Sequence, residues 1–566
     1  MKNSEIADIL DEIADLLEMD DVQFKPRAYR KAARNIRDLG EDIEDIYKGD
    51  NLKDIPGIGE SIKKKIIEFI ETGKVKKLEE LKKKTPVDIE SLSGVEGLGP
   101  KRINLLHKKL GIENLDDLEK AAEKGEISKI ENFGKTIEKK ILENIDFARK
   151  TGDRHLLGYI LPIANEIVED IKSDAIRIEL AGSIRRKVET VGDIDILATT
   201  KNNAKLIKTF IDIKDVTKIL LKGEKKVSVL ISGGIQVDLR IIEEDSFGAA
   251  LQYFTGSKDH NVALRKIAIK KGYKLNEYGI FEGKKKIESK NEKNIYKTLS
   301  LDWIPPELRE NRGEIKASIE KKLPSLIDYK DLKGDLHVHS NWSDGKDSIE
   351  DMVTGAKKLG HKFIAITDHI GNLKIAKSMK IKNLRKQMAE IEKIQEKNKD
   401  IHVFRGVEAN IEKDGSIDIS NEIIDEIDLV IGSIHSSLRM NKKEMTERLV
   451  NSIKGGKVDI IGHPTCRLIN KRKEISIDME KVLKAASDNN VIMEINAYPE
   501  RLDLNDYNVK LAIEKDVKLS IGTDAHNQDQ LKYFTLGVAV ARRGWAKKRD
   551  IINTQEIKEL KRTFKK

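Results

Sequence analysis

Three aspartates in two apolar runs have the types and spacing of a metal-binding catalytic site. Asp193 and Asp195 lie two residues apart in the strand-like run 192–197 (GDIDIL), and Asp238 lies in a second such run. Side chains alternate between faces along a strand, so Asp193 and Asp195 should point the same way. Three converging carboxylates repel one another unless cations lie between them. Two magnesium ions, or manganese ions, would satisfy this cluster and would suit transfer of a nucleotidyl group from a triphosphate.

A short loop about ten residues upstream supplies groups that bind phosphates. Residues 180–186 read LAGSIRR, in which Gly182, Ser183 and Arg186 would contact a triphosphate through a backbone N–H, a hydroxyl and a guanidinium. Two acids spaced D-x-D are, by themselves, most often exposed residues of an edge strand. The loop and the third aspartate together favour a nucleotidyl-transfer site.

A second group of candidate ligands lies toward the C-terminus. Eight of the 11 histidines follow residue 334, beginning with His337 and His339, whose imidazoles would share one face of a strand. All candidates except Asp344 follow or end an apolar, strand-like run, as catalytic residues of a β/α barrel do. Six histidines, two aspartates and a glutamate can hold two or three zinc or manganese ions, with Glu408 suited to bridge them. The candidates are His337, His339, Asp344, His369, Glu408, His435, His463, Asp524 and His526.

Two glycine-rich turns lie in the N-terminal part of the chain. Residues 55–59 (IPGIG) and residues 95–100 (VEGLGP) each precede a basic, helix-like run. Each G-x-G pair lets the backbone turn tightly, and the following helix presents unpaired N–H groups to a phosphate. One such turn is most often an ordinary helix corner, but two, each followed by basic residues, favour helix-hairpin-helix contacts with the DNA backbone. The residues expected at DNA are Gly57, Gly59, Gly97, Gly99, Lys101 and Arg102.

The composition limits what the chain can be. Its 566 residues suggest roughly three or four domains, and 39% apolar residues suffice for several cores. The formal charge is only +9, so nucleic-acid binding should come from local basic patches. No apolar run approaches the ~18 residues of a membrane span, and the single cysteine, Cys466, excludes an internal disulfide. We therefore expect a cytoplasmic enzyme rather than a secreted or membrane protein.

With these motifs, residues 1–320 resemble family X DNA polymerases, the DNA polymerase beta family. The resemblance rests on GSIRR, GDIDIL, the two hairpin turns and residues 253–257 (YFTGS). It implies that Tyr253 and Phe254 flank the sugar of the incoming nucleotide, and that Asn261 and Arg265 lie near the nascent base pair and the template. The nucleotide-binding residues that it implies are Gly182, Ser183, Arg186, Tyr253, Phe254, Gly256, Asn261 and Arg265.

The same resemblance draws attention to Lys65. Family members use a lysine on the helix after the first hairpin to form a Schiff base with the sugar of an abasic site. Aligned through IPGIG, that catalytic lysine is Lys65, and Lys25 and Tyr29 match phosphate-contacting positions. Lys65 also belongs to a run of three lysines, which by itself would indicate a DNA-facing patch. Both interpretations stay open.

Residues 333–566 resemble a PHP (polymerase and histidinol phosphatase) domain, a barrel-like metal-dependent phosphoesterase. All nine ligand positions of that family are filled, with Asp344 where the family often has histidine, an oxygen ligand that favours manganese over zinc. The resemblance implies a 3′–5′ exonuclease, with a 3′-phosphatase or abasic-site nuclease as further activities, acting through a metal-bridged hydroxide.

The two resemblances imply a multidomain α and α/β protein that fills short gaps in DNA repair. The expected partners are gapped or nicked duplex DNA and dNTPs, with a monomer as the default. Two alternatives stay open: a nucleotidyltransferase acting on RNA or a small molecule, and a metal-binding scaffold for DNA ends. The expected domains are a helical lyase-like domain (1–85), a fingers-like helical domain (86–152), a nucleotidyltransferase palm (153–255), a thumb (256–315), a linker (316–332) and a PHP β/α barrel (333–566).

Overall fold

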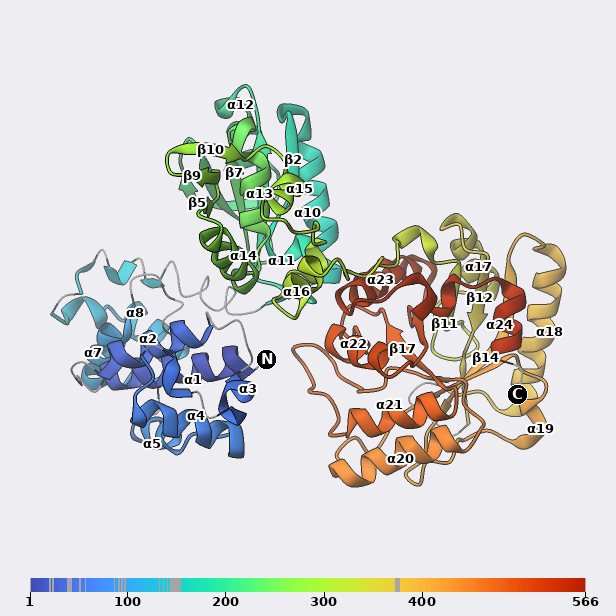
Figure 1. The fold of residues 1–566 in the computed structure, drawn as a ribbon. Coiled ribbons are helices and arrows are strands. Elements are labelled where there is room, and N and C mark those ends of the chain that lie inside the picture. Colours follow the sequence, from blue (N-terminus) through green and yellow to red (C-terminus); the bar gives the residue numbers. More distant parts are fainter. Residues whose placement is uncertain are drawn as a thin grey trace.

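The chain forms three parts in the computed structural model: an N-terminal helical region (residues 2–142), a middle region (154–331) and a C-terminal barrel (334–564) (Figure 1). No helix among the described residues is long and apolar enough to cross a bilayer. The structure describes residues 2–19, 22, 25–37, 43–49, 52–55, 57–85, 87–89, 92, 95, 98–131, 133–135, 137–139, 141–142, 154–371 and 377–564.

The N-terminal region is built from short helices around its own apolar core. Along the first helix Ile6, Leu10, Ile13 and Leu17 recur at helical spacing and are buried, so the helix packs one apolar stripe against its neighbours. The helices are α1 (Lys2–Met19), α2 (Lys25–Arg37), α3 (Ile43–Lys48), α4 (Glu60–Thr72), α5 (Lys76–Lys84), α7 (Pro100–Leu110) and α8 (Leu115–Glu123).

Both predicted hairpin turns lead directly into a helix. Gly59 is the N-cap residue of α4, and Gly99 is the N-cap residue of α7. Gly57 has φ +87°, a conformation that side chains other than glycine rarely adopt. Gly97, predicted at the second turn, lies outside the described residues.

The middle region contains a five-stranded sheet in the order β2-β4-β7-β6-β5. The inner strands β4 and β7 are parallel, and the other neighbouring strands are antiparallel. Side chains at matching positions of β4 and β7 therefore lie next to each other. Helices α10 (Leu157–Ile171) and α12 (Asn203–Ile211) contribute to its buried core. The strands are β2 (Arg177–Leu180), β4 (Asp193–Thr199), β5 (Val216–Lys222), β6 (Lys226–Ile231) and β7 (Ile235–Ile241).

A smaller subdomain follows this sheet. It has its own apolar core and a three-stranded sheet in the order β10-β9-β8. The segment expected to link the subdomain to the barrel (316–332) is packed: Ser318 is buried and donates to the Asp302 carbonyl at 2.8 Å, and Ile327 is also buried. The elements are α13 (Phe247–Thr255), α14 (Lys258–Lys270), β8 (Lys274–Asn276), β9 (Gly279–Glu282), β10 (Lys285–Glu288), α15 (Glu292–Thr298) and α16 (Glu314–Ile319).

The C-terminal region confirms the predicted barrel. Its described strands are all parallel, and a bridge between Val338 at the end of the first strand and Ala525, just after the last, nearly closes the sheet. The strands are β11 (Gly334–Val338), β12 (Phe363–Ile366), β13 (His369–Ile370), β14 (His402–Asn410), β15 (Leu429–Ser433), β16 (Ile460–Ile461), β17 (Ile492–Asn496) and β18 (Leu519–Gly522). The helices are α17 (Ile349–Lys358), α18 (Ile381–Lys397), α19 (Asn421–Ile424), α20 (Lys442–Lys454), α21 (Met479–Asp488), α22 (Asp506–Glu514), α23 (Phe534–Arg543) and α24 (Ile557–Thr563).

The middle region and the barrel share one hydrophobic core. Helix α10 approaches the barrel so closely that a Cβ added at Gly158 would lie 2.7 Å from Leu536 and 2.8 Å from Pro499. Ion pairs also connect the barrel to the middle region, including Arg467 with Glu189 at 2.6 Å and Arg542 with Glu307 at 2.7 Å. The two regions therefore meet through a packed interface rather than through a tether.

Candidate functional site

The three predicted aspartates converge on β4 and β7, the two neighbouring inner strands of the five-stranded sheet. Because β4 and β7 are parallel and in register, Asp195 lies directly opposite Asp238, with Asp193 two residues earlier on the same face. Asp193 and Asp195 are half-buried, whereas Asp238 is 4% exposed. A Cβ on Gly182 would collide with the Asp195 carboxylate, so only glycine lets the phosphate loop lie against the aspartates.

The environment of the triad favours a bound cation. Burial and the neighbouring Asp193 and Asp238 carboxylates raise the pKa of Asp195 to about 7. Burial would also raise the pKa of Asp238, but hydrogen bonds from Lys226, at 2.7 Å, and Gln236, at 2.8 Å, bring it below its ordinary value. The triad fits divalent metal ions, because an oxygen-only donor set with unfavourable carboxylate repulsion is what hard cations stabilise.

The phosphate loop forms the short helix α11 (Gly182–Arg185) beside the triad. Ser183 is half-buried at its start. Arg186 follows the helix; its Nη1 donates to the Thr255 carbonyl at 2.5 Å and its Nε to Glu310 at 3.0 Å. The loop is thus fastened to the segment that contains YFTGS.

The predicted nucleotide segment lies at the end of α13 and the start of α14. The rings of Tyr253 and Phe254 meet edge to face with centroids 5.1 Å apart. Gly256 has φ +71°, and a Cβ there would lie 3.1 Å from Arg186 Nη1. Asn261 accepts a hydrogen bond from Gln252 at 2.6 Å and donates one to the Tyr253 carbonyl at 2.7 Å, so it holds the segment's shape. Arg265 is half-buried one helical turn later.

The structure brings Lys65 together with its predicted partners around a cavity of about 820 Å³. Lys65 Nζ lies 5.7 Å from the centroid of the Tyr29 ring and donates to Ser61 Oγ at 3.1 Å. The cavity is also lined by Lys25, Gly57 and Gly59. Apolar walls with a few amines suit a sugar-phosphate unit.

The second hairpin presents its two predicted cations differently. Lys101 is exposed on the first turn of α7. Arg102 is half-buried, with its guanidinium 5.7 Å from the centroid of the Phe133 ring. Lys101 is therefore the more accessible of the two to a phosphate.

All nine predicted barrel ligands gather at the carboxyl ends of the strands. Glu408, at 1% exposure, lies at the centre: its carboxylate is 3.0 Å from His369 Nδ1, 3.1 Å from His463 Nε2 and 3.3 Å from His435 Nε2. His339 Nε2 lies 3.2 Å from His337 Nε2 and 3.1 Å from Asp524. The remaining pair is His526 with Asp344, 3.4 Å apart.

Within the described residues seven of these ligands form three overlapping groups, and the donor atoms of each group lie within 4.8 Å of one another. Nδ1 of His339 is buried there without a hydrogen-bond partner, 3.9 Å from the Asp344 carboxylate. Imidazole nitrogens this close to carboxylates fit divalent metal ions, and such an ion would satisfy this unpaired nitrogen. The groups are His337, His339 and Asp524; His339, Asp344 and His369; and His369, Glu408 and His435.

Two residues that the sequence did not single out support this site. Glu494 accepts from His337 Nδ1 at 2.6 Å and from the His463 backbone N–H at 2.6 Å, so it orients two ligands at once. Arg501 lies 3.5 Å from the Asp524 carboxylate. The alternation Glu494-Ile495-Asn496 at the end of a strand was an available signal for Glu494, whereas Arg501 comes from a loop without a pattern.

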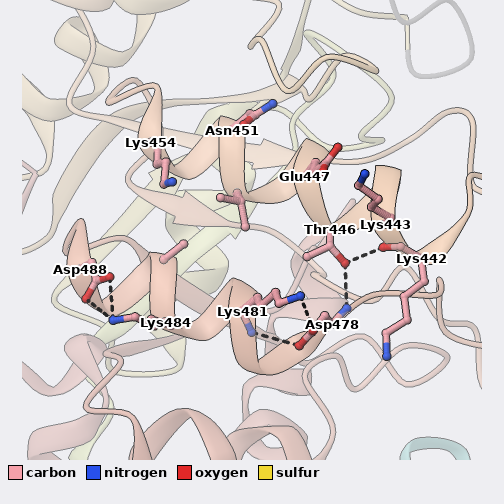
Figure 2. Close-up of a pocket in the computed structure, with 12 residues that line it drawn as sticks. Lys442, Lys443, Thr446, Glu447, Asn451, Lys454, Asp478, Lys481, Lys484 and Asp488 are labelled. Carbon is pink, nitrogen blue, oxygen red and sulfur yellow. Dashed lines mark hydrogen bonds and ion pairs between the residues drawn. The ribbon is translucent and has the colours of Figure 1, made fainter.

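A separate groove of about 960 Å³ runs between α20 and α21 on the barrel (Figure 2). Lys481 is paired with Asp478 at 3.2 Å and Lys484 with Asp488 at 3.1 Å. Its lining contains no histidine and none of the predicted site residues, so this groove is separate from the triad and from the barrel ligands.

Family models match four segments of the chain. Residues 1–75 match a helix-hairpin-helix domain and residues 89–146 match a SAM-like helix-hairpin-helix tandem. Residues 250–310 match the DNA polymerase beta thumb, and residues 335–498 match the PHP domain. These matches cover both hairpins, the nucleotide segment and most barrel ligands.

Relatives of known name support one assignment for the whole chain. The DNA polymerase/3′-5′ exonuclease PolX of Bacillus subtilis is 36% identical over 576 residues, covering 100% of both chains. A probable phosphatase of Shewanella halifaxensis is 32% identical over 36% of this chain and 80% of its own. A probable phosphatase of a Thermoanaerobacter species is 28% identical over 40% of this chain and 92% of its own. The chain belongs to the family X DNA polymerases that carry a C-terminal PHP domain.

Proposed function

We propose that this protein is a DNA polymerase that fills short gaps during repair and trims 3′ ends with its barrel. The observation that carries the proposal is the register of β4 and β7, which sets Asp195 opposite Asp238 beside the phosphate loop. Three carboxylates next to a phosphate-binding turn suit nucleotidyl transfer. The full-length similarity to PolX supports both activities on one chain.

In the polymerase reaction the chain's own residues bind and orient. Asp193, Asp195 and Asp238 would hold two Mg²⁺, with Mn²⁺ as a substitute, and bound metal would activate the primer 3′ hydroxyl and neutralise the triphosphate. Ser183 and Arg186 bind the phosphates of the dNTP. The remaining proposed contacts come from the YFTGS segment and α14: Tyr253 and Phe254 against the sugar, Gly256 beside Arg186, and Asn261 and Arg265 toward the nascent pair.

In the trimming reaction the barrel ligands would hold two or three Mn²⁺ or Zn²⁺ ions, which supply an activated hydroxide when bound. Glu408, which contacts His369, His435 and His463, would suit a bridging position between two of these ions. Arg501, beside Asp524, is placed to meet a phosphate oxygen of the DNA end. The monomeric state and the cytoplasmic location stay predictions.

The hairpins hold the DNA duplex through its backbone without reading sequence. Gly57, Gly59, Gly99 and Lys101 are the proposed phosphate contacts in the described residues. Gly97 and Arg102 complete the proposed set.

One experiment tests both main activities. A labelled primer on a one-nucleotide-gapped duplex is incubated with Mg²⁺ or Mn²⁺, with and without dNTPs. We expect addition of the template-matched nucleotide with dNTPs and shortening without them. Addition of unmatched nucleotides, or transfer only to RNA or a small molecule, would replace the polymerase by another nucleotidyltransferase. Absence of any turnover with either metal would favour a metal-binding scaffold for DNA ends.

A lyase activity at Lys65 is part of the proposal and has its own test. Lys65 Nζ faces Tyr29 and Ser61 in a cavity with Lys25. Borohydride should trap the protein covalently on DNA with an incised abasic site, and Lys65→Ala should lose the trapped product while Lys64→Ala keeps it. If borohydride does not trap the wild-type protein, the lyase proposal is wrong and DNA binding is the role that remains for this cavity.

A further inference from the structure

Arg186 uses only part of its guanidinium on the protein. Nε donates to Glu310 at 3.0 Å and Nη1 to the Thr255 carbonyl at 2.5 Å. Nη2 has no hydrogen-bond partner among the described residues, and the side chain is 14% exposed. One nitrogen therefore remains to meet an anion, at a position next to Gly256 of the nucleotide segment.

The carboxylate that binds Arg186 is shared with an arginine of the barrel. Arg543, the last residue of α23, donates from Nη1 to Glu310 at 3.0 Å and to the backbone carbonyl of Arg186 at 2.8 Å. Arg543 is 7% exposed, so these contacts are shielded from water. A residue more than 300 positions away in the chain thus touches both the backbone of Arg186 and its partner.

The charges continue from Arg543 into the interface. Arg543 also binds Asp506 at 2.8 Å, and Asp506 binds Arg312 at 2.7 Å. Arg186, Arg543 and Arg312 thus alternate with Glu310 and Asp506, which leaves one positive charge in excess. The cluster borders a cavity of about 420 Å³ between the middle region and the barrel.

The charge balance at Arg186 depends on Arg543. Burial would raise the pKa of Glu310, but Arg543 and Arg186 hold it below its ordinary value, so the carboxylate stays ionised. If Arg543 were absent, Glu310 would neutralise Arg186, and Asp506 would neutralise Arg312. Because partly buried charges are screened little by salt, that compensation would weaken the attraction of Arg186 for a phosphate.

We propose that Arg543 of the barrel is a positioning residue for nucleotide binding in the polymerase reaction. By engaging Glu310 and the Arg186 carbonyl, it leaves the charge of Arg186 available to the triphosphate of the dNTP. The inference rests on the proposed role of Arg186 as a ligand of the triphosphate. It makes the barrel a structural part of the synthetic site, in addition to its own chemistry.

The test measures dNTP binding and chemistry separately in the full-length protein. Single-turnover extension of a one-nucleotide-gapped duplex, at a series of dNTP concentrations, gives the dissociation constant of the dNTP and the maximal rate. We expect Arg543→Ala to raise the dissociation constant about tenfold, equivalent to about 1.4 kcal/mol, with a smaller change in the maximal rate. Arg543→Lys keeps the charge but replaces the fork of guanidinium donors that reaches both Glu310 and Asp506, so its dissociation constant should lie between those of the wild-type protein and Arg543→Ala.

Two further variants separate positioning from general damage to the interface. Arg542→Ala removes the neighbouring interface ion pair with Glu307 and should leave dNTP affinity unchanged. Arg543→Ala/Glu310→Gln should recover most of the affinity, because glutamine still accepts from Arg186 Nε without neutralising it. Trimming of the primer without dNTPs and the unfolding temperature show that each variant is folded.

The outcomes distinguish this inference from the function on which it rests. A wild-type protein that fails to extend primers would overturn the proposed function and the inference with it, and normal dNTP affinity in Arg186→Ala would overturn the triphosphate role. If Arg186→Ala weakens dNTP binding but Arg543→Ala does not, only the inference is wrong. Equal losses in Arg542→Ala and Arg543→Ala, or no recovery in the double variant, would also overturn it.

Discussion

The two metal-ligand clusters of this protein differ in donor type and enclosure. The triad offers three carboxylates, and Asp193 and Asp195 are half-exposed. The barrel offers six imidazoles with three carboxylates, and His337, His339 and Glu408 are each at most 1% exposed. Oxygen ligands suit magnesium or manganese, whereas imidazole suits zinc. The two candidate clusters therefore differ in the divalent ions that their donor sets favour.

The clusters also differ in how their ligands are supported. In the barrel, Glu494 fixes His337 at 2.6 Å, and Asn496 donates to Asp524 at 3.1 Å. In the triad only Asp238 has such support among the described residues, from Lys226 and Gln236. Hydrogen bonds behind a ligand fix its orientation and strengthen metal binding, so the barrel cluster should hold its ions more firmly than the triad.

The largest expected effect comes from removing a triad ligand. Asp195→Ala or Asp195→Asn should lower DNA synthesis by on the order of 10³-fold, because the metals lose the carboxylate opposite Asp238. Trimming should stay at the wild-type rate, since the barrel ligands are unchanged. Primer extension and primer shortening on the same gapped duplex measure both. Extension at near wild-type rate in either variant would show that the triad is not the site of DNA synthesis.

Removing a shared barrel ligand should have the opposite selectivity. His339 belongs to two of the three donor groups, so His339→Ala should cost at least one bound ion per chain and about 100-fold or more in trimming. Extension should persist. Metal content by elemental analysis and shortening of a labelled primer test this. His402→Ala, at the opposite end of a barrel strand, is the matched control and should change neither. Trimming that survives the loss of metal would place the nuclease elsewhere.

A weaker effect is expected from the support behind the ligands. Glu494→Gln keeps the size of the side chain but weakens the orientation of His337 and His463, and should reduce metal affinity by about 10-fold to 100-fold. Competition titration with a chelator measures this affinity, and Glu480→Gln on the surface of α21 is the control. Unchanged metal affinity in Glu494→Gln would show that hydrogen bonds behind the ligands do not distinguish the barrel cluster from the triad.

The candidate ligands could be proposed from the sequence because most of them lie on strands or just after the ends of strands. The spacing of Asp193 and Asp195, and of His337 and His339, follows from alternation along a strand, and the structure brings these pairs together as predicted. The barrel was also predictable, since each candidate ligand except Asp344 follows or ends an apolar run. These are local patterns, so they survive without knowledge of the tertiary structure.

The contacts between regions were not predictable in the same way. Arg543 meets Glu310 and Arg186 only because α23 packs beside the middle region, and no pattern in the sequence relates these positions. The segment 316–332 was expected to be a linker on charge alone, yet Ile327 is buried in the shared core. Interface residues depend on the docking of two folded parts, which a local pattern does not encode.

The smallest expected effect tests whether the two clusters act on the same bound DNA duplex. Lys101→Ala/Arg102→Ala removes two proposed phosphate contacts, so the dependence of log affinity on log salt should fall by about 1.8. Because both reactions need the same bound duplex, extension and trimming should fall by the same factor at low DNA concentration and recover at saturation. Lys382→Ala/Lys386→Ala removes equal charge from the barrel surface and should change the salt dependence less. If only extension falls, the hairpin holds DNA for the triad alone, and the barrel binds the 3′ end through other contacts. The two sites would then differ in how they bind DNA as well as in the metals that they favour.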